Sequence, residues 1–245
     1  MSTSKKVEFE SLTSAVEKCV EPGVLYMVST PIGNLEDITL RALRVLKEVD
    51  VVAAEDTRHT GMLLKHYSLD KRLISYHDFN KKRKAPLLIE HLKANHSVAV
   101  CSDAGTPGIS DPGYYLEQLA IRDNIKVGPI PGASAFLSAL VVSGLPTDRF
   151  AFEGFLPAKP GKRRKRLVEL QEEKRTIILY ESPHRFTKTF DDISEILGQR
   201  RVVVARELTK KFEEIIRGTP EEIKQTLGER KLKGELVILI EGKSN

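Results

Sequence analysis

The sequence predicts an α/β protein of two domains, with a mostly parallel sheet in the first domain and a mixed sheet in the second. Three observations support this fold class. From residue 24 onward, short apolar runs alternate with segments of helical periodicity. Loops rich in Gly and Pro follow several of those runs. After the polar stretch 145–149 the pattern changes and ends in strands expected to pair antiparallel. We therefore expect an N-terminal α/β domain over 23–144, a linker over 145–149 and a C-terminal α/β domain over 150–245.

The elements are expected in the following order. Apolar runs rich in Val, Ile and Leu are typical of buried strands, and apolar residues that recur every three or four positions indicate helices. The expected strands cover 24–30, 49–55, 72–77, 98–101, 126–130, 150–155, 176–180, 201–205, 212–218 and 235–240. The expected helices cover 37–48, 57–66, 84–94, a segment from 111, a segment from 131–135 to about 144, 162–173, 183–197 and 220–227. Residues 1–22 are expected to be a partly helical or disordered N-terminal extension.

Composition narrows the class of protein. The chain has 245 residues and a net charge of +5, with 40% hydrophobic and 30% charged residues, as in an ordinary globular protein. No apolar run approaches the roughly 18 residues of a membrane-spanning helix, and the first residues lack the apolar core of a secretory signal. The two cysteines, Cys19 and Cys101, show neither metal-ligand nor redox spacing. We expect a cytoplasmic protein without a bound metal.

The loop 102–113 (SDAGTPGISDPG) is the most informative segment. It combines Gly and Pro with few bulky side chains, so its backbone can approach a ligand closely. Three further loops, 30–34, 55–59 and 131–134, also follow expected strands. The carboxyl ends of parallel strands share one edge of a sheet, where ligands of open α/β sheets bind. We therefore expect the four loops to converge on one crevice. A plain strand-to-helix turn is the alternative for the loop 102–113 taken alone.

Standard nucleotide and hydrolase signatures are missing. No segment fits G-x-G-x-x-G or G-x-x-x-x-G-K-[ST]. The six histidines are scattered, and no Ser-His-Asp set can be assigned.

Two basic blocks suggest a polyanionic partner. The block 81–84 leaves a solvated helix face and a polyanion contact equally open. The block 159–166 carries six cations in eight residues, and we favour phosphate binding there because Pro160 and Gly161 place it at the start of a helix. The residues expected to contact RNA are Arg58, His59, Lys162, Arg163, Arg164, Lys165, Arg166 and Arg185.

Seven segments together resemble the tetrapyrrole methylase family, and within it the ribosomal branch. They are 29–37, 54–61, 102–113, 131–135, 153–157, 180–185 and 205–210. The resemblance covers about 24–242. Some members continue beyond the position of Gly242 into a short C-terminal region, and no RNA contact from that region is carried to this chain.

The resemblance implies a homodimeric methyltransferase that binds S-adenosylmethionine in a cleft between its two domains. The implied substrate is the ribose 2′-hydroxyl of a cytidine near the decoding centre, in 16S rRNA or the assembled small ribosomal subunit. The implied cofactor contacts are Pro31, Asp103, Gly105, Thr106, Ile109, Gly132, Ala133, Ser134, Leu156, Ala205 and Glu235.

Methyl transfer from a sulfonium needs in-line positioning and gains from a general base that takes the hydroxyl proton. Candidate catalytic bases are Glu181, His184, Glu207 and, if burial lowered its pKa, Lys210. Glu181 and Glu207 could instead pair with Arg185 and Arg206.

Two other functions remain open from the sequence. One is methylation of a tetrapyrrole or corrin small molecule, which predicts an apolar pocket and gives 159–166 no role. The other is a non-catalytic RNA-binding factor in ribosome assembly, which requires the basic blocks but not the Gly/Pro loops.

Overall fold

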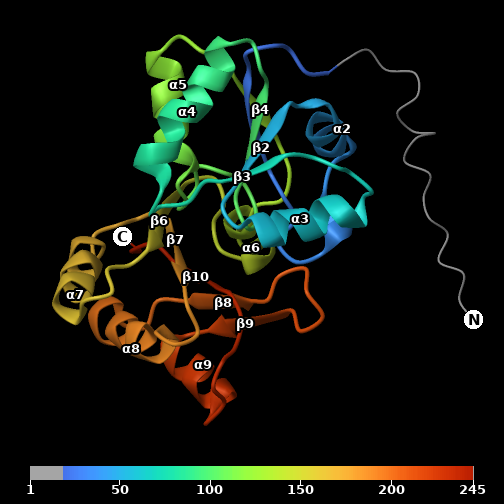
Figure 1. The fold of residues 1–245 in the computed structure, drawn as a ribbon. Coiled ribbons are helices and arrows are strands. Elements are labelled where there is room, and N and C mark those ends of the chain that lie inside the picture. Colours follow the sequence, from blue (N-terminus) through green and yellow to red (C-terminus); the bar gives the residue numbers. More distant parts are fainter. Residues whose placement is uncertain (1–18, 245) are drawn as a thin grey trace, which may run out of the picture. The chain divides into compact units, whose positions relative to one another are not determined.

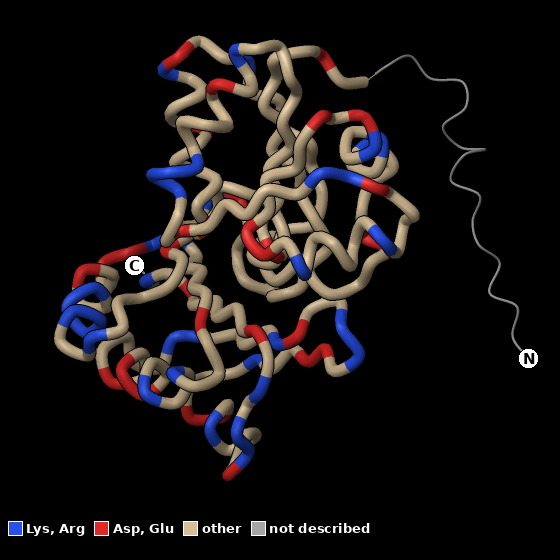
Figure 2. The backbone as a smooth tube through the Cα atoms, viewed as in Figure 1, with Lys and Arg blue, Asp and Glu red and all other residues tan. Residues whose placement is uncertain are grey.

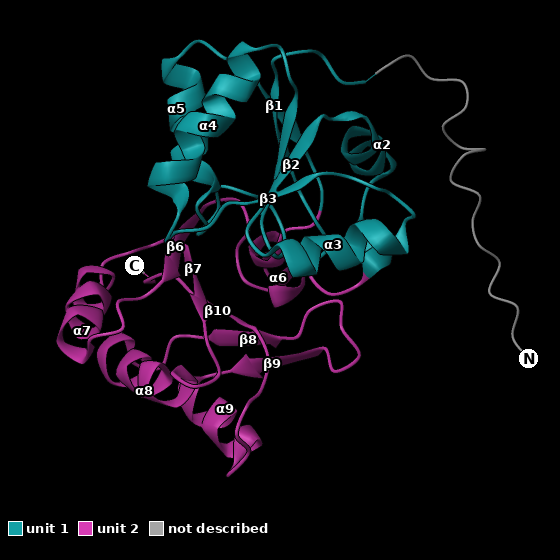
Figure 3. Ribbon diagram, viewed as in Figure 1, with its two compact units in different colours: residues 1–31, 35–132 teal, residues 32–34, 133–245 magenta. Residues whose placement is uncertain are grey.

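The computed structural model describes residues 19–244, which form two compact units (Figures 1 and 3). Unit 1 holds the described residues up to Pro31 together with Leu35–Gly132. Unit 2 holds Ile32–Asn34 and the described residues from Ala133 onward. Both units are α/β, which confirms the predicted fold class. Residues 1–18 of the expected N-terminal extension lie outside the described range.

Unit 1 is built on a five-stranded parallel sheet in the order β3-β2-β4-β1-β5. Its strands are β1 (Leu25–Val28), β2 (Val51–Ala54), β3 (Leu73–Ser75), β4 (Val98–Cys101) and β5 (Val127–Ile130). Its helices are η1 (Leu35–Asp37), α2 (Leu40–Glu48), α3 (Thr57–His66), α4 (Lys81–Lys93) and α5 (Gly113–Arg122).

Alternate strand residues bury opposite faces of this sheet. Tyr26 and Val28 of β1 pack with residues of α2 and α3 in one core cluster. Leu25 and Met27 pack with residues of α4 and α5 in another. Helices therefore cover both faces (Figure 1). This explains why the strands read as continuous apolar runs, as parallel strands buried on both sides do.

Unit 2 contains a mixed sheet in the order β6-β7-β10-β8-β9. Its strands are β6 (Phe150–Phe155), β7 (Thr176–Glu181), β8 (Val202–Arg206), β9 (Glu214–Gly218) and β10 (Leu236–Ile240). Only β6 and β7 pair parallel; β10 pairs antiparallel with β7 and β8, and β8 with β9. The expected return to antiparallel pairing is confirmed. Its helices are α6 (Ala135–Ser143), α7 (Pro160–Glu169), α8 (Phe186–Leu197) and α9 (Pro220–Leu227).

The boundary between the units differs from the expected linker at 145–149. Helix α6 precedes that linker, yet it belongs to unit 2. Its residues Ala139 and Leu140 are buried against Val203, Val237 and Leu239 of the mixed sheet. The opposite face of that sheet is covered by α7, α8 and α9. Without α6 one face of the second sheet would lack its helix, so the chain divides near residue 132.

Within the described range, no helix has both the length and the apolar character needed to span a bilayer.

Candidate active site

The loops after β1 and β4 are joined by reciprocal backbone hydrogen bonds. The Thr30 amide donates to the Gly105 carbonyl at 2.9 Å, and the Gly105 amide donates to the Thr30 carbonyl at 3.1 Å. The hydroxyls of Ser29 and Thr106 lie 3.0 Å apart. The Thr30 hydroxyl donates to the Ser102 carbonyl at 3.3 Å. Ser29, Thr30 and Ser102 are buried, so these bonds also satisfy polar groups removed from water.

The loop after β2 joins the same rim through carboxylates. The Asp56 amide donates to Asp103 Oδ1 at 2.9 Å, and the Asp103 amide donates to Glu55 Oε2 at 3.2 Å. Burial raises the pKa of Glu55, although the bond from the Asp103 amide opposes this shift. The loop after β5 approaches too, because a Cβ at Gly132 would lie 2.9 Å from the Ser29 Cβ. These contacts bring the four strand-end loops together along one edge of the unit 1 sheet, as strand direction predicts, whereas the hollow described below is lined by the loops after β1, β2 and β4.

The loop 102–113 is held by one carboxylate and by left-handed glycines. Gly105 has φ +81° and Gly108 has φ +88°, a backbone region that side-chain-bearing residues rarely adopt. The Asp111 carboxylate accepts the amides of Gly108 at 2.8 Å and Gly113 at 2.7 Å. Burial raises the pKa of Asp111 against the effect of these bonds. Asp111 was not among the residues predicted from the sequence, although an Asp two residues before a Gly in a loop is a known signal for such a turn.

A hollow of about 250 Å³ lies beside the joined loops in unit 1. Three sequence-predicted residues, Pro31, His59 and Asp103, line it together with the buried Thr30 and Ser102. The remaining lining residues are Thr60 and the apolar Leu35, Met62 and Leu63. A hollow with a few fixed polar groups and apolar walls suits a small organic ligand.

Unit 2 gathers a second cluster of predicted residues. Lys210 Nζ lies 2.9 Å from Glu207 Oε1 and 3.2 Å from Glu235 Oε2. Glu207 Oε1 also accepts the Glu235 amide at 3.0 Å. The loop 32–34 packs here: the Asn34 amide donates to the Thr209 hydroxyl at 3.1 Å, and a Cβ at Gly33 would clash with Lys210 Cγ. The structure thus brings Glu207, Lys210 and Glu235 together.

The electrostatics of this cluster correct one expectation. Burial alone would lower the pKa of Lys210, but the hydrogen bond to Glu207 and the charge of Glu235 outweigh burial and raise it. Burial would raise the pKa of Glu207, but the bonds from Lys210 and the Glu235 amide hold it below its ordinary value. Lys210 therefore stays protonated at neutral pH and does not fit the role of a base.

Glu181 and His184 occupy different environments. Glu181 is 2% exposed, and its carboxylate accepts from the Thr189 hydroxyl at 2.5 Å and the Ser182 amide at 2.8 Å. It also lies 3.3 Å from Arg185 Nε. With its oxygens engaged and buried, Glu181 stabilises the end of β7, which matches the structural alternative. His184 is exposed to solvent.

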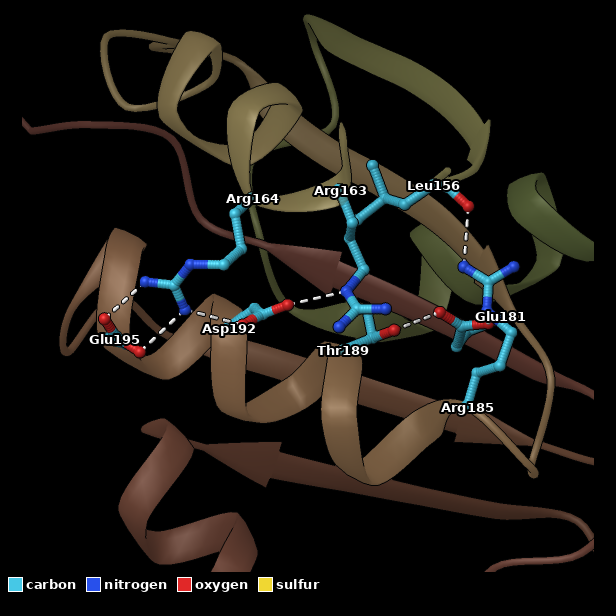
Figure 4. Close-up of polar contacts among 8 residues, drawn as sticks. All are labelled: Leu156, Arg163, Arg164, Glu181, Arg185, Thr189, Asp192 and Glu195. Carbon is cyan, nitrogen blue, oxygen red and sulfur yellow. Dashed lines mark hydrogen bonds and ion pairs between the residues drawn. The ribbon is translucent and has the colours of Figure 1, made fainter. Parts of the chain in front are cut away.

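The three arginines of the basic block on α7 pair with acids of unit 2, and Figure 4 draws the pairs of Arg163 and Arg164. Arg163 is 4% exposed and its Nε donates to Asp192 Oδ2 at 2.7 Å. Arg164 donates to Asp192 at 2.8 Å and pairs with Glu195. Both acids come from α8, about thirty positions away. These pairs show that much of the block holds α7 to α8.

Arg166 and Arg185 are engaged in the same way. Arg166 pairs with Glu153 through two bonds of 2.9 Å and with Glu169 at 2.7 Å. Arg185 donates to the Leu156 carbonyl at 2.7 Å (Figure 4). The expectation that the whole block faces RNA needs correction: buried Arg163 is unavailable at the surface.

The remaining expected RNA contacts lie at the surface. Lys162 and Lys165 are exposed and have no ion pair among residues 19–244. Arg58 is exposed beside Asp56, which it contacts at 2.6 Å, and His59 is exposed next to it.

The other expected cofactor contacts are distributed over both units. Ile109 is exposed in the loop 102–113, and Ala133 and Ser134 are half-buried before α6. Leu156 and Ala205 are buried in the second unit's core. Across the described part of the chain, no group of three or more His, Cys, Asp or Glu side chains is placed to hold a metal.

Comparison with known proteins agrees with this architecture. A solved uroporphyrin-III C-methyltransferase from Thermus thermophilus, complexed with S-adenyl homocysteine, aligns with a TM-score of 0.60 at 22% identity. The alignment covers 89% of this chain and 97% of that one. This likeness concerns the fold.

Sequence relatives are more specific. Ribosomal RNA small subunit methyltransferase I of Halalkalibacterium halodurans is 51% identical over 91% of this chain and 77% of its own length. The protein of that name from Escherichia coli O157:H7 is 50% identical over 90% of this chain and 78% of its own. Residues 24–224 match the family described as Tetrapyrrole (Corrin/Porphyrin) Methylases. The fold, the loop geometry and these similarities show that the chain belongs to the tetrapyrrole methylase family, and within it to the small subunit ribosomal RNA methyltransferase I group.

Proposed function

We propose that this chain transfers the methyl group of S-adenosylmethionine to the ribose 2′-hydroxyl of a cytidine in 16S rRNA near the decoding centre. The observation that carries the proposal is the set of four loops meeting at one edge of the unit 1 sheet, in a chain about half identical to small subunit rRNA methyltransferases. The cofactor is supported by family membership and by a structural relative that was solved in complex with S-adenyl homocysteine.

The rim of joined loops is the proposed cofactor site. Its backbone groups are fixed by the Thr30–Gly105 bonds and by Asp111, so they are organised before a ligand arrives. Such preorganisation reduces the entropic cost of binding. The proposed contacts are Pro31, Asp103, Gly105, Thr106, Ile109, Gly132, Ala133 and Ser134, with Leu156, Ala205 and Glu235 from the second unit.

The bound cofactor supplies an electrophilic methyl on sulfonium sulfur: the carbon–sulfur bond breaks as the oxygen–carbon bond forms, and sulfur keeps the electron pair. The chain's task is positioning, which contributes roughly 7–11 kcal/mol in well-aligned systems. A general base that takes the hydroxyl proton adds about 10²–10⁴-fold. Of the four candidate bases, Glu207 and His184 remain. Glu181 is saturated with hydrogen bonds, and Lys210 is held protonated.

The reaction test uses cofactor labelled on the methyl group. The purified protein is incubated with naked 16S rRNA, with small subunits from cells lacking the protein, or with a tetrapyrrole precursor. Label at a 2′-O position of a cytidine in either RNA sample supports the proposal. Label in the tetrapyrrole alone identifies a small-molecule enzyme, and RNA binding without any transfer identifies an assembly factor; either result overturns the proposal.

We also propose that the active form is a homodimer and that it works in the cytoplasm, where small subunits mature. Light scattering after gel filtration measures the first, and a monomeric mass would contradict it. Cell fractionation measures the second, and recovery of the protein outside the cytosolic fraction would contradict it.

A further inference from the structure

Phe79 is the most exposed large apolar side chain in the described structure. It is 98% exposed in the turn between β3 and α4. Its neighbour Tyr76 is 1% exposed, so this turn buries one aromatic ring and presents the other to solvent. Because the Phe79 ring stays in water, it contributes no burial energy to the stability of the fold. Exposed aromatic side chains are a feature of binding surfaces.

The turn that carries Phe79 is held in place on both sides. The side chain of Asn80 accepts the His77 amide at 2.9 Å and donates to the Ser75 carbonyl at 3.2 Å. The Tyr76 hydroxyl donates to the Pro112 carbonyl at 3.2 Å, which ties the turn to the loop 102–113. These hydrogen bonds hold the backbone on both sides of Phe79.

The basic block 81–84 begins two residues after Phe79 in the sequence. Lys82 and Arg83 are exposed, and neither forms an ion pair with any residue in 19–244. Figure 2 shows Lys and Arg gathered at this beginning of α4. The one acid in the turn, Asp78, is neutralised by Lys81 at 2.7 Å. The sequence left the role of the block 81–84 open between a solvated helix face and a polyanion contact. This block differs from the one on α7, whose arginines form ion pairs within unit 2.

The turn also lies at the edge of the unit 1 sheet that carries the joined loops. It follows the carboxyl end of β3, and β3 is parallel to the strands that carry the joined loops. Lys81 Nζ lies 5.9 Å from the ring centre of Tyr115 on α5. A strand of RNA held at Phe79 would thus reach the proposed cofactor loops.

We infer that the Phe79 turn is a contact for single-stranded substrate RNA, in which a base stacks on the Phe79 ring and adjacent phosphates lie against Lys82 and Arg83. Stacking platforms flanked by cations are the common means of holding unpaired nucleic acid. The inference rests on the proposed RNA substrate. It adds a residue that holds an unpaired base of the substrate RNA.

The test compares Phe79→Ala with Phe79→Tyr, which keeps a ring, and with Leu87→Ala. Leu87 is a matched control because it is exposed, apolar and on α4. Three quantities are measured in the full chain: KM for undermethylated small subunits, affinity for a labelled single-stranded RNA of about ten nucleotides, and affinity for S-adenosylmethionine.

Loss of the ring is expected to raise KM and to weaken oligonucleotide binding about fivefold or more. Phe79→Tyr and Leu87→Ala are expected to behave like the parent, and cofactor affinity is expected to stay constant in all three. Replacing Lys82 and Arg83 by Ala should flatten the salt dependence of oligonucleotide binding, because fewer counterions are released.

Unchanged KM and oligonucleotide affinity in Phe79→Ala would overturn the inference, and so would an altered oligomeric mass with unchanged RNA affinity, which would identify a contact between copies of the chain. If the parent protein methylates no RNA, the proposed function fails by itself. The oligonucleotide measurement still decides the role of Phe79 in that case, so the two failures are distinguishable.

Discussion

Thr30 and Gly105 exchange both of their backbone hydrogen bonds, at 2.9 and 3.1 Å, across loops that follow different strands. This isolated pairing extends the contact between β1 and β4 beyond the sheet itself. It places Ser29 beside Thr106 and aligns the amide of Asp103 with Glu55. These bonds join the loops after β1, β2 and β4 along one edge of the parallel sheet.

Thr106→Arg is expected to abolish cofactor binding without unfolding the protein. Thr106 is half-buried on the rim, where its hydroxyl meets Ser29, so a long cation would fill the proposed site and leave the sheet intact. The Kd for S-adenosylmethionine by calorimetry should rise more than about tenfold. Thr106→Ser, which keeps the hydroxyl, is the control. Unchanged affinity in the Arg variant would remove the loop 102–113 from the cofactor site.

Gly132→Ala is expected to weaken cofactor binding by displacing the end of β1. The new Cβ would lie 2.9 Å from the Ser29 Cβ, closer than side chains tolerate. Overpacking of this kind costs about 1–3 kcal/mol. Gly161→Ala is the matched control, because a Cβ there meets nothing within 4 Å. Denaturant unfolding and calorimetry would measure both variants, and equal behaviour of the two would contradict the close approach of the β5 loop.

The meeting of the four loops could be predicted from the sequence because it follows from strand direction alone. Once the strands ending near residues 30, 55, 102 and 130 are parallel and adjacent, their carboxyl ends share one edge. No side-chain detail is needed for that step. Element bounds could be predicted for a different, local reason: helix α9, for example, begins with Pro220 after the capping residue Thr219.

The features that could not be predicted depend on partners far away in the chain. Arg163 belongs to a basic run that is typical of a solvated or RNA-binding face, and only the packing of α8 brings Asp192 to it. Helix α6 precedes an apparent linker, and only the mixed sheet reveals which apolar face it covers. The local sequence predicts helical or strand periodicity and the residues that form turns. Which charged side chains pair depends on residues that only the tertiary fold brings together.

Arg163→Ala is expected to destabilise the protein by about 3 kcal/mol, because it leaves the buried carboxylate of Asp192 with a single remaining cation. Lys165→Ala on the same helix is exposed and should change the free energy of unfolding by less than about 0.5 kcal/mol. RNA affinity should show the opposite ranking at temperatures where both variants are folded. Urea unfolding and RNA titration measure the two effects, and a neutral Arg163→Ala would contradict the structural role of the pair.

The Glu207–Lys210 pair is expected to make stability depend on pH in a defined window. The folded-state pKa of Glu207 lies below its ordinary 4.5, so its contribution is present above pH 4.5 and is lost as the pH falls toward the folded value. The folded-state pKa of Lys210 lies above its ordinary 10.5, so its contribution is present below pH 10.5 and is lost as the pH rises through the folded value.

Lys210→Met should therefore be less stable than the parent across the neutral range, by no more than about 1 kcal/mol because the pair is partly solvated. The difference should shrink in acid. Lys231→Met, at an exposed lysine, is the control and should show no such profile. Chemical unfolding at a series of pH values measures it, and a parent-minus-variant difference that stays constant through the acid range would show that the pair contributes nothing through charge.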